Sequence, residues 1–285
     1  MKKILSLITL LILFSSTADA QDYSNLCTKY VPDKNFKGTL TSITGFNLLT
    51  KNIIEHQISK RLKKELNSDF KVKIDSFYGN NILNGEFKNL TAEAKSVVFN
   101  NFYISNIKAS TICDYNHVEY IDNKIIFKEN MPIKYSSQVT QDDLNKTLES
   151  TEYKKIINKM NNSEYISSLF DIKASKIEIK DNKIILKYEI IPLSILNTAS
   201  IIKIKPINVN LKANLKAENG KIVLCDVEVN SKKQKHLPKS LETVLNPLEY
   251  DVKVSKNNKG KLTVEKTEIK DNIINIEGYM LIFKD

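Results

Sequence analysis

The spacing of apolar residues predicts one long helix in the first quarter of the chain. Between Phe46 and Leu66 these residues recur mostly at intervals of three and four, which places them on one stripe of a helix. The stripe consists of Leu49, Ile53, Ile54, Ile58, Leu62 and Leu66. Charged residues occupy the other side of the helix. A stripe of this length requires an extended apolar partner.

Most of the remaining chain has the alternation that is typical of strands. Apolar and polar residues alternate from 207 to 216 and again from 221 to 229, with Asn219-Gly220 between the two runs. Asn-Gly suits a tight turn because a type I′ turn requires two positive φ angles. We therefore predict that these two strands pair as an antiparallel hairpin.

Three further Asp-Asn pairs lie between apolar strand residues, at Asp122-Asn123, Asp181-Asn182 and Asp271-Asn272. Since Asp and Asn tolerate left-handed backbone, each pair predicts a hairpin turn. Their unequal spacing indicates recurrent turn chemistry and not a solenoid repeat. A capped helix is expected to start at Thr140 and to continue through Met160, and a short helix is expected from Pro238 to Leu245.

The first twenty residues have the pattern of a secretory signal peptide. Lys2 and Lys3 precede an apolar run from Ile4 to Phe14, and Ala18-Asp19-Ala20 provides a small-residue cleavage site. An uncleaved membrane anchor is the alternative, although a run of roughly eleven residues is too short to span a bilayer. We expect residues 1–20 to be removed and residues 21–285 to form one elongated domain that is exported, periplasmic or secreted.

Composition and charge exclude some classes of protein and weaken others. The 285 residues are 41% hydrophobic, which excludes intrinsic disorder, and the formal net charge is +10. Arg61 is the only arginine, and the lysine groups lack interleaved aromatic residues. Since arginine makes the bidentate contacts that read bases, we expect no nucleic-acid partner.

The three cysteines permit one disulfide and one odd thiol in an oxidising compartment. We pair Cys27 with Cys113, because Cys27 lies in an irregular segment that needs a tether. Cys225 lies in an alternating strand together with Val223 and Val227, and this pattern predicts a small buried side chain.

The sequence contains no constellation typical of an enzyme or a metal site. His56, His117 and His236 lie far apart and outside the usual metal-binding motifs, so we expect no metal, no cofactor and no catalytic residues. A Cys-His pair assembled from distant residues is the remaining catalytic alternative. The basic residues near the end of the long helix have two interpretations: a solvated face near the helix C-terminus, or a surface that attracts anionic lipid headgroups.

The order of these features resembles the LmeA-like family of exported phospholipid-binding proteins. The matching segments are the helix Ile53–Leu66, Val72-Lys73-Ile74, the link Leu83–Phe87, the strand Leu90–Ala94, the helix Thr140–Leu148, the turn Ala217–Ile222, the segment Leu237–Leu248 and the closing strand pair Ile269–Ile282. The segment before Phe46 and the many surface lysines have no counterpart in that family.

The resemblance implies an α+β fold in which a strongly curved, mainly antiparallel sheet wraps around the long helix, with short accessory helices. It also implies a phospholipid or another acyl-chain ligand, with its chains held between helix and sheet, and transient contact with an anionic membrane surface. The expected lining is Ile53, Ile54, Ile58, Leu62, Val209, Leu211, Ala213, Leu215, Val223 and Val227. Lys60, Lys63 and Lys64 are the candidates for headgroup or membrane contact. The alternative is an exported structural or protein-interaction module with a fully packed core.

Overall fold

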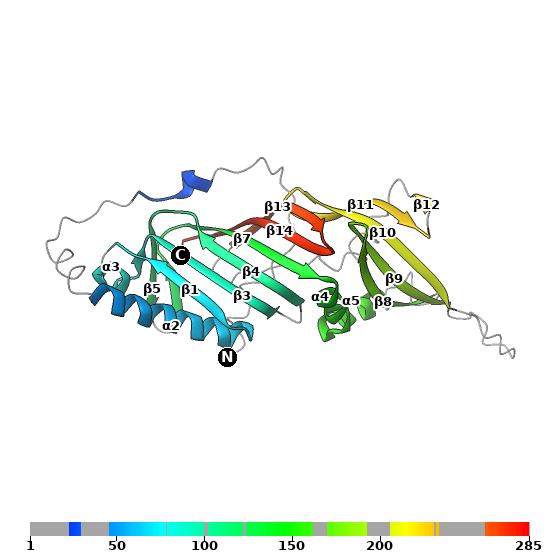
Figure 1. Ribbon diagram of the computed structural model, residues 1–285, viewed down its shortest axis with the longest axis horizontal. Helices are drawn as coiled ribbons and strands as arrows, with labels where there is room; N and C mark the ends of the chain where they lie inside the picture. Colours follow the sequence, from blue (N-terminus) through cyan, green and yellow to red (C-terminus); the bar gives the residue numbers. More distant parts are fainter. Residues whose placement is uncertain are drawn as a thin grey trace.

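The protein is elongated, with two large antiparallel sheets that follow one another along its long axis (Figure 1). The computed structural model describes residues 23–29, 46–77, 79–99, 102–121, 124–161, 170–192, 206–230, 232–233 and 260–284. The expected signal peptide, the turn at Asp122-Asn123 and the expected helix Pro238–Leu245 lie outside these residues.

The larger sheet has six strands in the order β1-β3-β4-β7-β14-β13. Their bounds are β1 Phe70–Asp75, β3 Asn89–Phe99, β4 Phe102–Thr111, β7 Met131–Thr140, β13 Gly260–Lys270 and β14 Ile273–Ile282. A small sheet joins β2 Glu86–Phe87, β5 Asn116–Ile121 and β6 Lys124–Phe127. The chain therefore brings its closing strand pair, β13 and β14, beside β7 from its middle part.

The second sheet has five strands in the order β12-β11-β10-β9-β8. Their bounds are β8 Phe170–Lys180, β9 Lys183–Pro192, β10 Ile207–Glu218, β11 Lys221–Val229 and β12 Lys232–Lys233. The two sheets meet where β13 lies beside β10, and Val264 N donates a hydrogen bond to Gly220 O at 2.9 Å. One cluster of buried apolar side chains extends through both sheets.

The described hairpin turns confirm the turn predictions. Asn219 and Gly220 have φ angles of 53° and 75°, and β10 pairs with β11 as expected. Asp181-Asn182 and Asp271-Asn272 also have positive φ at both positions, and they connect β8 to β9 and β13 to β14. These turns could be predicted from the sequence because their positive φ angles depend on the two turn residues themselves.

The predicted fold class is wrong, because the protein is mainly β. Strands make up most of the described residues, and the sheets do not wrap around a helix. The helix over the expected residues, α2 (Phe46–Leu66), lies along the edge strand β1, as Figure 1 shows. Its apolar stripe is narrow and interrupted, since Ile53 is 62% exposed and Ile54, Ile58 and Leu62 are only partly buried. An apolar stripe shows that a helix needs a partner, but it does not show how much of that helix the partner covers.

Polar side chains of α2 fix the helix to this edge. The backbone N–H of Ile74 donates to the Glu55 carboxylate at 2.7 Å, and the Ser59 hydroxyl donates to the carbonyl of Phe70. These bonds satisfy backbone groups that an edge strand otherwise leaves unpaired. The helix therefore closes one border of the six-stranded sheet.

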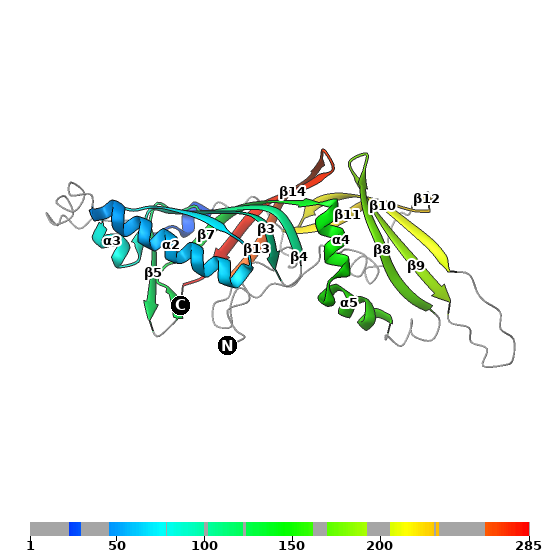
Figure 2. The ribbon, with the colours of Figure 1, turned by 60° about the horizontal axis from the view of Figure 1, so that its bottom comes forward.

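A second helix covers the edge strand β8 of the five-stranded sheet. Helix α4 (Gln141–Glu149) has the predicted cap at Thr140, in the form of a capping box with Asp143. Its Asn145 side chain both donates to and accepts from the backbone of Ile177 in β8, at 2.8 Å each. The helix does not continue as expected, because Ser150 is extended and α5 (Thr151–Asn161) starts a new direction. Both helices lie between the two sheets (Figures 1 and 2).

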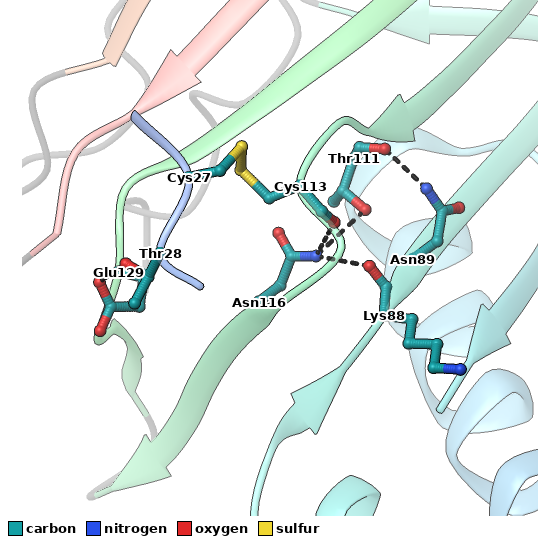
Figure 3. The surroundings of a disulfide bond; sticks show 8 residues. All are labelled: Cys27, Thr28, Lys88, Asn89, Thr111, Cys113, Asn116 and Glu129. Carbon is teal, nitrogen blue, oxygen red and sulfur yellow. Dashed lines mark hydrogen bonds between the residues drawn. A yellow bond between two sulfur atoms is a disulfide. The ribbon is translucent and has the colours of Figure 1, made fainter. Parts of the chain in front are cut away.

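The structure contains the disulfide between Cys27 and Cys113, which is the pairing expected from the sequence. It ties the short helix η1 (Tyr23–Leu26) and its following residues to the segment after β4 (Figure 3). Asn116 holds that segment in place, because its buried amide donates to Lys88 O and Cys113 O at 2.9 Å each. A disulfide is consistent with an oxidising, exported location.

Cys225 is not fully buried, which corrects the prediction for this residue. In the first half of β11 the buried residues are Ile222 and Leu224, so Cys225 points to the opposite, partly exposed face. Asp226 has a positive φ of 51°, and the register with β10 shifts there, so the side-chain alternation reverses before Val227. The remaining burial still raises the pKa of the Cys225 thiol.

Candidate functional site

A large cavity lies against the six-stranded sheet. Its volume is about 760 Å³, and its walls are α2, one face of the six-stranded sheet, the short helix α3 (Gly79–Leu83) and the small β2-β5-β6 sheet. This volume falls in the range of about 300–1,000 Å³ that is common for ligand pockets. Elements far apart in the sequence, from α2 to β14, contribute to the same space.

Helix α2 supplies one wall through residues one helical turn apart. Ile54, Ile58 and Leu62 line the cavity, and Gln57 and Arg61 accompany them on one side of this stripe. Residues three and four apart share a helix face, so these five side chains form one continuous strip. The strip places three apolar residues and two polar residues against the cavity.

The sheet wall is made of aromatic and aliphatic side chains. Its main contributors are Phe70 and Ile74 of β1, Ala92 of β3, Phe102, Ile104, Ile107 and Ala109 of β4, Ile133 and Tyr135 of β7, and Met280 and Ile282 of β14. Strand β4 supplies four of them. Phe102 and Ile104 face the cavity, and the side-chain alternation then shifts by one residue, so that Ile107 and Ala109 face the cavity as well. The surface offered to a ligand is therefore overwhelmingly apolar.

Most polar groups of the sheet wall already have partners in the protein; the exception among the described lining residues is Ser137 of β7, whose buried hydroxyl has no hydrogen-bond partner. Thr111 Oγ1 accepts from Leu90 N at 3.0 Å, and Ser110 Oγ donates to Asn89 Oδ1 at 3.3 Å. The Tyr135 hydroxyl donates to Thr263 O at 3.5 Å. Because these bonds engage the side-chain oxygens of Thr111, Ser110 and Tyr135, these three residues add little hydrophilic character to this side of the cavity.

Gly85 forms a close crossing at one end of the cavity. Its φ is +81°, and a Cβ added there would lie 1.8 Å from Val118 O. Val118 N also donates to Gly85 O at 3.0 Å, which joins the α3–β2 link to β5. Only glycine allows this approach. It brings Ile82 and Phe87, on either side of Gly85, into the cavity wall.

The structure brings three of the ten expected lining residues to this cavity, namely Ile54, Ile58 and Leu62. Ile53 is directed to solvent, because consecutive helix residues point about 100° apart and the next residue, Ile54, faces the cavity. The six sheet residues belong to β10 and β11 of the other sheet, and none of them lines the described cavity: they are Val209, Leu211, Ala213, Leu215, Val223 and Val227. Alternation identifies an apolar strand face, but it does not identify which sheet leaves space beside that face.

The three lysines chosen as headgroup candidates are all exposed. Lys63 pairs with Asp69 at 2.5 Å, and Lys60 and Lys64 also lie on the solvent side of α2. The basic residue that faces the cavity is their neighbour Arg61. Its position could have been found from the sequence, because Arg61 follows Ile54 and Ile58 at intervals of seven and three on the helix stripe.

A smaller depression of about 310 Å³ lies on the five-stranded sheet, and all its lining residues except Ile185 are polar or charged. Glu178 there pairs with Lys187 at 2.8 Å and with Lys176 at 3.1 Å. Hydrogen bonds from these two lysines lower the pKa of the Glu178 carboxyl. The opposite charges on this surface largely compensate one another, so the apolar cavity is the stronger candidate site.

Within the residues that the structure describes, no three His, Cys, Asp or Glu side chains gather in a way that could hold a metal ion. None of the described helices has both the length and the apolar character needed to cross a bilayer. No family model, curated protein or solved structure matches this chain. The likeness to the LmeA-like family therefore stays a prediction.

Proposed function

We propose that the protein binds a phospholipid or another acyl-chain ligand in the cavity beside α2. The observation that carries this proposal is a space of about 760 Å³ whose walls are almost entirely apolar. A fully packed core, which the alternative of a structural or protein-interaction module requires, would leave no such space.

The energetics of the cavity favour an alkyl chain as its occupant. Each methylene that leaves water for an apolar site contributes about 0.8 kcal/mol. Water gains little there, because a water molecule needs several polar partners and the wall offers few. Aliphatic and aromatic side chains therefore attract fatty chains more strongly than they attract small polar metabolites.

The cellular setting of the proposal is the cell envelope. The signal-like residues 1–20 and the disulfide both fit an exported protein, and the net charge of +10 favours transient contact with an anionic membrane surface. In this setting the protein carries lipid between membranes or to an envelope enzyme, and it has a binding role and no catalytic one. The likeness to the LmeA-like family supports the same function.

Organic extraction of the purified protein tests the proposal. We expect mass spectrometry of the extract to detect an acyl lipid in a reproducible ratio of about one per chain or below, because an apolar cavity retains its ligand during purification. A matched extract from an unrelated exported protein, purified from the same host, is the control. Protein that carries no lipid and also takes up no lipid from labelled vesicles would contradict the proposal.

A further inference from the structure

Arg61, the only arginine of the chain, differs in its position from the other basic residues of α2. The other basic residues of the C-terminal half of α2, Lys60, Lys63 and Lys64, are exposed, whereas Arg61 is half-buried and lines the cavity. Among the described lining residues it is the only basic one. Arg61 therefore places a permanent positive charge at the wall of the cavity.

The surroundings of Arg61 combine a polar neighbour with an apolar strip. Gln57, one helical turn earlier, also lines the cavity and can both donate and accept hydrogen bonds. Ile58 and Leu62 lie on the same face and continue into the apolar wall. The helix therefore offers a charged and polar side next to a surface suited to an alkyl chain.

The acidic residue of the described lining, Glu119, is already paired with another basic residue. Glu119 of β5 also lines the cavity, but Lys128 lies 2.9 Å from its carboxylate and His117 lies 3.6 Å away. Because a lysine already engages Glu119 closely, its negative charge repels an incoming anion less than an isolated carboxylate would.

The geometry points to Arg61, together with Gln57, as the site that binds the acidic headgroup of the acyl-chain ligand, either a carboxylate or a phosphate. This inference rests on the proposed function, since it assumes that an acyl chain occupies the cavity. The planar guanidinium group can donate two parallel hydrogen bonds to either anion. Such a charge-assisted pair is stronger beside an apolar cavity than in water. The ligand is thus oriented with its acidic end at α2 and its chain along Ile58 and Leu62.

Calorimetric titration of the delipidated protein with three single-chain probes tests this inference. Dodecanoate carries a carboxylate, dodecyl phosphate carries a phosphate, and dodecanol is neutral with the same chain. We expect Arg61→Gln to weaken binding of at least one anionic probe by about tenfold to a hundredfold, the usual effect of losing a charge-assisted hydrogen bond. Since dodecanol carries no acidic group, we expect Arg61→Gln to weaken dodecanol binding less than it weakens binding of that anionic probe. The anion that loses more affinity identifies the headgroup as a carboxylate or a phosphate.

Lys60→Gln is the matched control, because it removes the same charge from the neighbouring exposed position. We expect it to change the affinity for each probe by less than about threefold, as for other exposed charges. Arg61→Lys retains the charge but loses the planar fork, so its loss of affinity lies between those of the other two variants.

Two different failures can be distinguished by these titrations. If dodecanol and the anions bind, but Arg61→Gln changes none of the affinities, the role of Arg61 is wrong and acyl binding stands. If none of the three probes binds the unmodified protein, the proposed function is wrong, and this inference is overturned with it.

Discussion

Loss of the Cys27–Cys113 disulfide is expected to lower the free energy of unfolding by about 4–5 kcal/mol. The bond joins residues separated by 86 positions, and closing so long a loop restricts the unfolded chain strongly in the chain-entropy description. The described contacts that otherwise hold this N-terminal segment are few, and the clearest is the exposed hydrogen bond from Thr28 to Glu129. Urea unfolding of the Cys27→Ala/Cys113→Ala variant, compared with the unmodified protein, measures this loss.

Cys225→Ala is the matched control, because it removes a cysteine that makes no disulfide. We expect it to leave the unfolding free energy within about 1 kcal/mol of the original value, since Cys225 is only partly buried. A reductant should reproduce the loss in the unmodified protein and have no effect on the double variant. Full stability after both thiols have been shown to be reduced would contradict a stabilising role for the bond.

Filling the cavity is expected to abolish or strongly weaken binding of a neutral alkyl ligand. Ala109 lies in the sheet wall and is only partly buried, so a phenylalanine there projects into the cavity. Displacing two or more methylenes of a ligand removes about 0.8 kcal/mol each, which corresponds to a loss of more than about tenfold in affinity. Titration of dodecanol into Ala109→Phe, followed by calorimetry, measures the effect.

The control for this variant is Ala217→Phe. Ala217 is likewise a partly buried strand residue, but it belongs to β10 and lies outside the lining of the cavity. We expect it to bind dodecanol as the unmodified protein does. Equal affinity of Ala109→Phe and Ala217→Phe, with both variants folded by circular dichroism, would show that the alkyl chain binds elsewhere.

The features that the sequence predicted correctly depend on nearby residues. The turn at Asn219-Gly220 and the cap at Thr140 follow from the chemistry of one or two side chains, and both formed where expected. The helix α2 also formed over the expected residues, because its periodicity is local. Such features need no knowledge of distant parts of the chain.

The fold class was wrong because it depends on how distant strands pair. Alternation in β10 and β14 looks similar, yet β10 joins one sheet and β14 the other. The bulge near Asp226 reverses the face of β11, and no pattern in the sequence signals this change. Periodicity therefore could not predict which strands form each sheet, or that α2 lies at the edge of the six-stranded sheet.

The candidate site was only partly predictable for the same reason. Ile54, Ile58 and Leu62 followed from the helix stripe, whereas the sheet wall, with residues such as Phe102 and Ile107, was missed. Which of two apolar sheet faces leaves an empty space is a property of long-range packing. Arg61 was missed because it was grouped with the charged side of the helix, although its spacing from Ile54 and Ile58 places it on the stripe that faces the cavity.

Methyl NMR of isoleucine-labelled protein during titration with dodecanol tests the central claim most directly. If the alkyl chain occupies the cavity, the methyl signals of Ile54, Ile58, Ile104 and Ile107 shift progressively. The signals of Ile53, which is exposed, and of Ile184 and Ile222, which are buried in the second sheet, stay in place. Shifts confined to Ile53 or to the second sheet, or no shifts at saturating dodecanol, would contradict the account.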